Sequence, residues 1–279
     1  MDIIINGLAD DCPSNGKALA TLGNYWFNVL NILDSNPKNP ALGDFLRRYH
    51  QLSGDWIVAS PIHWEATHND AMIVAIGEML ELSDAEARDL FQEVQQFLKQ
   101  DNLTAYFHDT HLWLIQLNDK PYLASQSLPH ILHHSLLPIL KNLDESLYWQ
   151  RLFTEMQMLF SSRSGLSLKD GFNANGLWFH GEGEFHFSAK RQILTDDKRL
   201  IEAFPGFIQA LESTDKLNKN TVICLQNPQW LAALLDKAKN KGLAVQCYWN
   251  NIACQIPKQN RLIRLWRSLI HANKKKSDC

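Results

Sequence analysis

The sequence predicts an α/β fold with a largely parallel central sheet and flanking helices. It opens with an expected strand, Asp2–Asn6, that contains three consecutive isoleucines, a pattern typical of strands buried on both faces. Farther along, short apolar runs alternate with amphipathic segments, which is the order of elements in α/β proteins. The chain has 279 residues, of which 45% are hydrophobic, so it can bury the core of one large domain or of two packed lobes.

The elements of the first half follow from periodicity and from helix and turn signals. A helix is expected over 17–33, and the proline-containing segment 36–40 follows it as a breaker. Ser83 and Glu86 form a capping box, and the apolar stripe after them predicts a second helix. Strands are expected over 56–60, 71–76, 104–106 and 112–117.

The second half continues the alternation. Helices are expected over 129–140, 147–160, 199–211 and 228–241, and strands over 177–179, 221–225 and 243–248. We therefore expect a single α/β domain over 1–257, which could carry an inserted lobe of hairpin and helices over 61–145. Residues 258–279 are expected to form a basic amphipathic tail.

Segment 173–183 is the most informative stretch of the sequence. A short apolar run, 177–179, is entered through Asn175-Gly176 and followed by His180 and Gly181-Glu182-Gly183. This pattern predicts a buried strand that ends in an open loop. The two exit glycines allow a tight turn or the close approach of a ligand. From these residues alone, a core strand with an ordinary turn is the favoured interpretation.

Three segments resemble cofactor-independent phosphoglycerate mutases of the archaeal type, which belong to the alkaline phosphatase superfamily. Segment 175–183 is similar to their Asn-x-Ile-Trp-Leu-Trp-Gly-x-Gly signature. Segment 3–17 resembles their opening strand, Asp-Gly-x-x-Asp motif and Gly-Lys turn, and 54–58 resembles their Gly-Asp strand. The resemblance implies an alkaline-phosphatase-like core, here reduced in size.

A group of uncharacterised bacterial proteins of about this length resembles the chain more closely. Their Asp-Pro-Val-His-Leu segment is similar to Ser60–Trp64. Their Asn-Glu-x-Gln-Met-Leu helix is similar to Thr154–Leu159. Together these segments extend the resemblance, in patches, over most of residues 1–185.

The chain departs from the mutases at the residues that would carry phosphoryl transfer. The first aspartate of the opening motif is a metal ligand in that family, and this position is Asn6 here. A neutral amide is a poor replacement for a carboxylate on a divalent cation. The segment that would hold the phosphorylated serine contains only Ser35, in a turn-forming sequence, and no Asp-His pair follows His180. We therefore expect a pseudoenzyme that has kept part of the fold.

The favoured function is the binding of a phosphorylated or other anionic small molecule in a regulatory role, without a cofactor or a metal. The pocket is expected between the loops 6–10 and 178–183, where backbone amides and nearby basic side chains suit a phosphate or carboxylate. The expected ligand-binding residues are Asn6, Asp10, Lys17, Arg151, Asn175, Trp178, His180, Gly181 and Gly183.

An active metal-dependent phosphatase or phosphomutase is one alternative. It would use Asp10, Asp11, His63 and His180 with manganese or zinc. His63 and His68 also form an acid–base set with Glu65 and Asp70, because a histidine near a carboxylate can titrate near neutral pH. For this set, and for the clustered His130, His133 and His134, a packing or solvent-facing role is favoured.

The other alternative is a protein that binds a membrane surface or a partner through 258–276, where basic residues flank an apolar helical stripe. A terminal helix docked on the domain is favoured over it. The net charge of −3 gives no indication of a nucleic-acid partner.

Five scattered cysteines, none in a Cys-x-x-Cys pair, predict neither a zinc site nor a disulfide framework. This cysteine usage favours a cytoplasmic protein. We also expect no signal peptide and no membrane span, because no segment has the required apolar length.

Overall fold

The computed structural model divides the chain into two compact units. The first comprises Met1–Val29 and Lys190–Cys279, and the second comprises Leu30–Ala189. The second unit thus interrupts the sequence of the first, a division that the expectation of one domain did not include. Residues 61–145, where the sequence predicts an inserted lobe, lie within the second unit. The structure describes residues 1–12, 16–19, 23–34, 36, 39–161, 172–188, 191–212 and 217–258.

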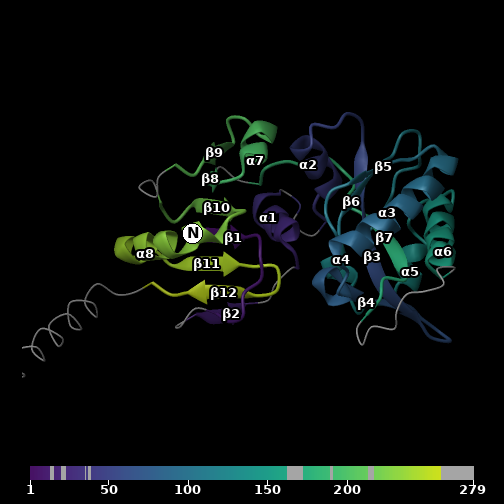
Figure 1. The fold of residues 1–279 in the computed structure, drawn as a ribbon, viewed down its shortest axis with the longest axis horizontal. Coiled ribbons are helices and arrows are strands. Elements are labelled where there is room, and N and C mark those ends of the chain that lie inside the picture. Colours follow the sequence, from purple (N-terminus) through teal and green to yellow (C-terminus); the bar gives the residue numbers. More distant parts are fainter. Residues whose placement is uncertain are drawn as a thin grey trace, which may run out of the picture. The chain divides into compact units, whose positions relative to one another are not determined.

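The first unit is built on a mixed seven-stranded sheet with the order β2-β12-β11-β1-β10-β8-β9 (Figure 1). The strands are β1 (Asp2–Ile5), β2 (Lys17–Leu19), β8 (Gln192–Thr195), β9 (Ile208–Ala210), β10 (Thr221–Leu225), β11 (Val245–Tyr248) and β12 (Ala253–Ile256). The run from β11 to β9 is parallel. β12 runs antiparallel to β11, and β2 runs antiparallel to β12.

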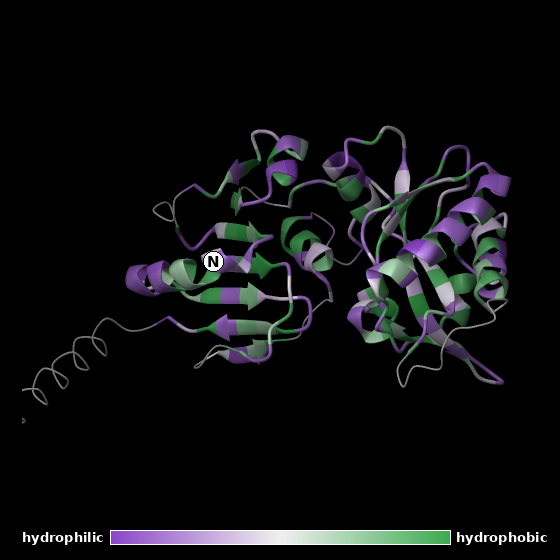
Figure 2. Ribbon diagram, in the orientation of Figure 1, coloured by the Kyte–Doolittle hydropathy of each residue, from purple (hydrophilic) through white to green (hydrophobic). Residues whose placement is uncertain are grey.

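The three isoleucines of β1 occupy the centre of this unit. Ile3, Ile4 and Ile5 are fully buried, and β1 pairs with β10 on one side and β11 on the other. After β10, the short 3-10 helix η3 (Pro228–Trp230) leads into α8 (Leu231–Lys241), whose buried residues join the same core cluster as β1. Figure 2 shows hydrophobic residues concentrated on β1 and β10 and hydrophilic residues on much of α8. The expected buried first strand is confirmed.

The second unit contains a five-stranded antiparallel sheet. Its strands are β3 (Trp56–Ala66), β4 (Ala71–Ile76), β5 (Thr104–Phe107), β6 (Trp113–Gln116) and β7 (Gly176–His180). β6 and β7 both pair with residues 58 and 59 of β3, so they lie on opposite sides of that strand. The informative segment 173–183 therefore forms its buried strand in this antiparallel sheet. The prediction of a largely parallel sheet applies only to the first unit.

The remaining helices are α1 (Tyr25–Leu33), α2 (Leu42–Tyr49), η1 (Gly77–Leu80), α3 (Asp84–Leu98), η2 (Lys99–Asp101), α4 (Leu128–Ile131), α5 (Leu137–Leu140), α6 (Tyr148–Ser161) and α7 (Lys198–Ala203). The predicted capping box is confirmed at the start of α3. Ser83 Oγ accepts the N–H of Glu86 at 3.3 Å, and the Ser83 N–H donates to Glu86 Oε2 at 2.9 Å. The mixed α/β class is thus observed, whereas the alkaline-phosphatase-like core stays a prediction.

Three predicted helices differ from the structure. Residues 17–19 form strand β2 and α1 begins only at Tyr25, because this segment pairs with β12. The predicted helix 129–140 is divided into α4 and α5, and His133 between them has a left-handed φ of 60°. The predicted helix 199–211 stops at Ala203, where Pro205-Gly206 interrupts it before β9.

A disulfide joins Cys12 to Cys254 of β12, with a Cα–Cα distance of 5.8 Å. The cysteine pattern did not indicate this bond, so the prediction of no disulfide framework missed one disulfide. Spacing could not reveal this pair, because 242 positions separate the two residues and the sheet order brings them together. Cys224 and Cys247 are buried as free thiols.

Ser35 and residues 259–279 of the expected tail lie outside the described residues. In the part of the chain that is described, no helix combines the length and apolar character that a membrane crossing requires.

Candidate functional site

The carboxyl ends of β1 and β10 form the candidate site of the first unit. β10 lies between its parallel neighbours β1 and β8, and the chain leaves β8 toward β9 but leaves β10 toward β11, in opposite directions across the sheet. Open α/β sheets bind ligands at such a switch point, outside the carboxyl ends of the strands. The predicted residue Asn6 directly follows β1 here, and Gln226 directly follows β10.

Amide side chains bridge this edge of the sheet. Asn6 Nδ2 donates to Gln226 Oε1 at 2.6 Å, and Gln226 Nε2 donates to Asp197 Oδ2 at 3.4 Å. The carboxylate of Asp196, which follows β8, accepts the backbone N–H groups of Gln226 and Asn227 at 2.7 and 2.8 Å. The edge is thus held together by its own side chains.

These residues do not fit the metal cluster that the mutase resemblance would imply. Asn6 presents a donor nitrogen to Gln226, and both oxygens of Asp196 already accept backbone N–H groups. Divalent cations bind carboxylates more readily than neutral amides, and the amide of Asn6 stands where the resemblance implies a carboxylate ligand. Over the described ranges, no group of three or more His, Cys, Asp or Glu side chains is placed to hold a metal ion.

The predicted ligand-binding residues are divided between the two units. Asn6, Asp10 and Lys17 belong to the first, and the other six belong to the second. Asp10 is exposed, and Lys17 is exposed on β2 in register with Gln255 of β12. The pocket between loops 6–10 and 178–183 stays a prediction.

Asn175 fixes the start of β7 in the second unit. Its Oδ1 accepts the Trp64 N–H at 2.9 Å, and its Nδ2 donates to the Trp64 carbonyl at 2.8 Å. Its own N–H donates to the Ile62 carbonyl at 2.9 Å. The side chain therefore continues the β3–β7 ladder beyond Gly176 and holds the backbone of Trp64 in place.

Trp178 and Gly181 are also engaged in packing. Trp178 is buried, and its Nε1 donates to the Gln126 carbonyl at 3.0 Å. Gly181 has a φ of +78°, and its carbonyl accepts the N–H of Gly43 at 2.9 Å. A Cβ on Gly181 would lie 3.1 Å from Leu42 Cβ. The close approach that this glycine allows is thus made by the start of α2.

Glu182 and Gly183 complete the loop after β7. Glu182 is buried, and its Oε1 accepts Asn39 Nδ2 at 3.0 Å and the Ser125 N–H at 3.1 Å. Burial raises the pKa of Glu182, because the carboxylate loses hydration. Gly183 is exposed with a φ of +99°.

His180 is fully buried at the end of β7. Its Nε2 lies 3.1 Å from Ser60 Oγ on the neighbouring strand β3. Burial lowers the pKa of His180 to about 3, since the imidazolium would lose its hydration. His180 is therefore neutral near pH 7, which fits a packing residue better than an exchanging acid or base.

We expect His180 to make folding stability depend on pH. Its unfolded pKa is about 6.5, so the unfolded state binds one more proton below that pH and stability falls as pH falls. Between pH 7 and pH 5 the loss should be about 2 kcal/mol for the wild-type chain relative to His180→Gln. Urea unfolding of both proteins at the two pH values measures the difference, from which the contribution of Glu182 cancels. Equal pH dependence in the two proteins would show that His180 titrates normally.

The other predicted residues of the second unit have separate partners. His63 Nδ1 lies 2.6 Å from the Asn173 carbonyl. Arg151 is exposed on α6, where it pairs with Asp101 at 3.7 Å and with Glu155 at 3.5 Å. Neither lines the cavity that contains His68 and Asp70, described next.

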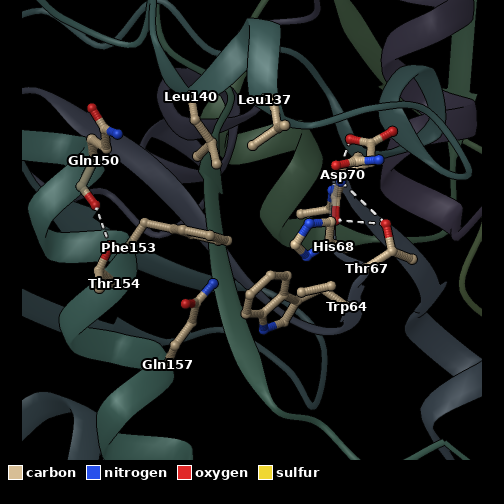
Figure 3. Close-up of a pocket in the computed structure, with 13 residues that line it drawn as sticks. Trp64, Thr67, His68, Asp70, Leu137, Leu140, Gln150, Phe153, Thr154 and Gln157 are labelled. Atoms are coloured by element: carbon tan, nitrogen blue, oxygen red, sulfur yellow. Dashed lines mark hydrogen bonds between the residues drawn. The ribbon is translucent and has the colours of Figure 1, made fainter.

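A cavity of about 350 Å³ lies in the second unit between the β3–β4 hairpin and helices α5 and α6. Figure 3 shows Trp64 and Phe153 projecting into it from opposite walls, with His68 and Asp70 on the hairpin side. The lining residues are Trp64, Ala66, Thr67, His68, Asn69, Asp70, Ala71, Leu137, Leu140, Gln150, Phe153, Thr154 and Gln157.

Several polar groups of the lining have unused hydrogen-bonding capacity. Within the described residues, the side chains of His68, Asn69, Gln150 and Gln157 form no hydrogen bond. Asp70 is different, because its Oδ1 accepts Ser135 Oγ at 2.6 Å and the Ala71 N–H at 2.7 Å. The hairpin is therefore fixed by its own contacts, while the amides and the imidazole can serve a ligand.

Sequence reasoning missed most of this lining. Trp64 and Gln157 entered only as parts of resembling segments, and Gln150 and Phe153 were not singled out. A signal was present, because positions 150, 153, 154 and 157 share one helix face at three- and four-residue spacing. Comparisons of the chain with family models, with curated proteins and with solved structures find no match.

Proposed function

We propose that the chain is a non-catalytic protein on a phosphoglycerate-mutase-like scaffold and that it binds a small organic molecule in a regulatory role. The ligand site is the cavity between the β3–β4 hairpin and α6. The observation that carries the proposal is that two aromatic rings and four unengaged polar side chains meet in about 350 Å³. Partly apolar cavities of this size with a few converging polar groups are typical of ligand sites.

The positions of the resembling segments support this assignment. Trp64 comes from segment 60–64, and Thr154 and Gln157 come from segment 154–159. The signature strand lies directly behind: Phe153 packs edge-on against Trp178, with ring centroids 5.6 Å apart. The signature therefore serves as the support of the cavity wall in this proposal.

The amide-bridged edge of the first unit supports the absence of catalysis. Phosphoryl transfer depends on cations and charged donors that neutralise developing charge. Asn6 and Gln226 offer neutral groups that bond to one another. A protein that binds without reacting can still regulate, because its ligand shifts the population of the state that it binds.

Blocking the cavity tests the proposal. We expect at least one compound of a metabolite panel to raise the melting temperature of the wild-type chain, and Gln157→Trp to abolish that shift by filling the cavity. Met158→Trp is the matched control, because Met158 is the next residue of α6, is 68% exposed and lies outside the lining.

The informative comparison is between the two tryptophan variants. Stabilisation retained in Met158→Trp and lost in Gln157→Trp supports the cavity. Equal stabilisation of both variants, or no stabilisation of the wild-type chain by any compound, would contradict it.

A further inference from the structure

We infer that the ligand of this cavity is an uncharged saccharide, seated with one ring face on the indole of Trp64. This inference rests on the proposed function and names its ligand class. It replaces the anionic ligand that the sequence predicts with a neutral one.

The charge of the lining is the first argument. Among the described lining residues there is no lysine, arginine or glutamate, and the ionisable side chains are those of His68 and Asp70. Phosphate and carboxylate sites use arginine or lysine donors, so a phosphorylated metabolite would lack a counter-charge here. A carboxylate at Asp70 also disfavours an anion in the same space. The lining therefore suits a neutral molecule.

The aromatic geometry is the second argument. Trp64 and Phe153 have ring centroids 6.1 Å apart and ring planes at 61°, so they do not form two parallel plates around a flat base. They offer one indole face with a ring edge beside it. A sugar ring presents an apolar face of C–H groups to a single aromatic surface, while its hydroxyls remain at the rim.

The indole is held in place before any ligand arrives. A Cβ on Gly176 would lie 3.2 Å from Trp64 Cδ1, so the pyrrole ring of the indole lies directly against this glycine. Asn175 binds both backbone polar groups of Trp64. The Asn-Gly pair that opens the signature strand therefore positions the aromatic surface of the cavity. Preorganisation of this kind lowers the cost of binding.

The unengaged polar groups supply the third argument. The amides of Asn69, Gln150 and Gln157 each carry donors and an acceptor, and the imidazole of His68 adds one of each when neutral. Hydroxyl groups both donate and accept, so they can satisfy both ends of such side chains. His68 and Asn69 are exposed, and Gln150 and Gln157 are half-buried, so a ligand that covers them favours binding only if it replaces their hydrogen bonds to water.

Saturation-transfer NMR with the full chain tests the inference. The probes are neutral mono- and disaccharides, with nucleosides and sugar phosphates as competing classes. We expect signal on the C–H protons of one ring face of a neutral sugar and a dissociation constant of about 1 mM or tighter. Trp64→Ala should weaken binding roughly tenfold or more, and Tyr122→Ala is the control, since Tyr122 is an aromatic residue of the same unit that is 69% exposed outside the lining.

A second variant keeps the inference testable if the Trp64→Ala protein does not fold. Gln157→Leu deletes one amide and should also weaken sugar binding, whereas Gln92→Leu on the exposed face of α3 should not. Binding of nucleosides or sugar phosphates in place of neutral sugars would overturn the inference and leave the proposed function standing. Sugar binding that survives both cavity variants would also overturn it. If no sugar, nucleoside or sugar phosphate binds, both the inference and the proposed function are contradicted.

Discussion

Reduction of the Cys12–Cys254 disulfide should lower the free energy of unfolding of the first unit by about 3 to 5 kcal/mol. The bond closes a loop across 242 positions, so in the unfolded chain it removes a large part of the conformational entropy. It also ties the segment after β1 to β12, the strand between β11 and β2. Urea unfolding with and without a thiol reductant measures the change.

A double variant isolates the disulfide from other effects of the reductant. Cys12→Ser with Cys254→Ser should unfold at the urea concentration of the reduced wild-type chain and should not respond to reductant. The buried thiols of Cys224 and Cys247 remain in both proteins. An identical midpoint for oxidised and reduced wild-type protein would show that the two cysteines are not bonded in solution.

Gly43→Ala should destabilise the second unit by at least about 3 kcal/mol. An alanine inside a helix normally stabilises it relative to glycine, so the expected sign is reversed here. The added Cβ would lie 2.0 Å from the Trp56 carbonyl oxygen and 2.7 Å from Ile57 Cα. These are backbone atoms of β3, and they cannot move aside without breaking the sheet.

Gly77→Ala is the matched control for that substitution. Gly77 has a φ of +53° and no atom within 4 Å of a Cβ built on it, so the cost should be only the backbone strain of about 1 kcal/mol. Urea unfolding compares the two variants. A Gly43→Ala protein as stable as the wild type would mean that α2 does not approach β3 as closely as described.

The sequence predicted helices and strands correctly where local sequence signals determine them. The isoleucine run of β1, the Ser83–Glu86 capping box and the buried strand after Asn175-Gly176 all carry such signals. The prediction failed where pairing with a segment far away in the sequence determines the secondary structure. Lys17–Leu19 becomes a strand through its pairing with β12, more than two hundred positions away.

The candidate site was harder to predict for the same reason. The mutase resemblance predicts a ligand-binding role for the polar residues of segment 173–183, but Asn175 and His180 bond to β3 and Gly181 bonds to α2. The cavity instead combines a hairpin and two helices that the sequence separates by more than sixty positions. From the sequence alone, the aromatic residues that line the cavity cannot be distinguished from residues of the core.

Turnover of phosphoglycerate tests most directly our proposal that the chain has a mutase-like scaffold without phosphoryl-transfer chemistry. The assay follows interconversion of 2- and 3-phosphoglycerate by the purified chain supplied with manganese or zinc. We predict no turnover above a protein-free control, because the resemblance implies a metal-binding carboxylate at the position of Asn6, whose amide instead donates to Gln226. Metal-dependent turnover that is lost in Asn6→Ala would contradict the account.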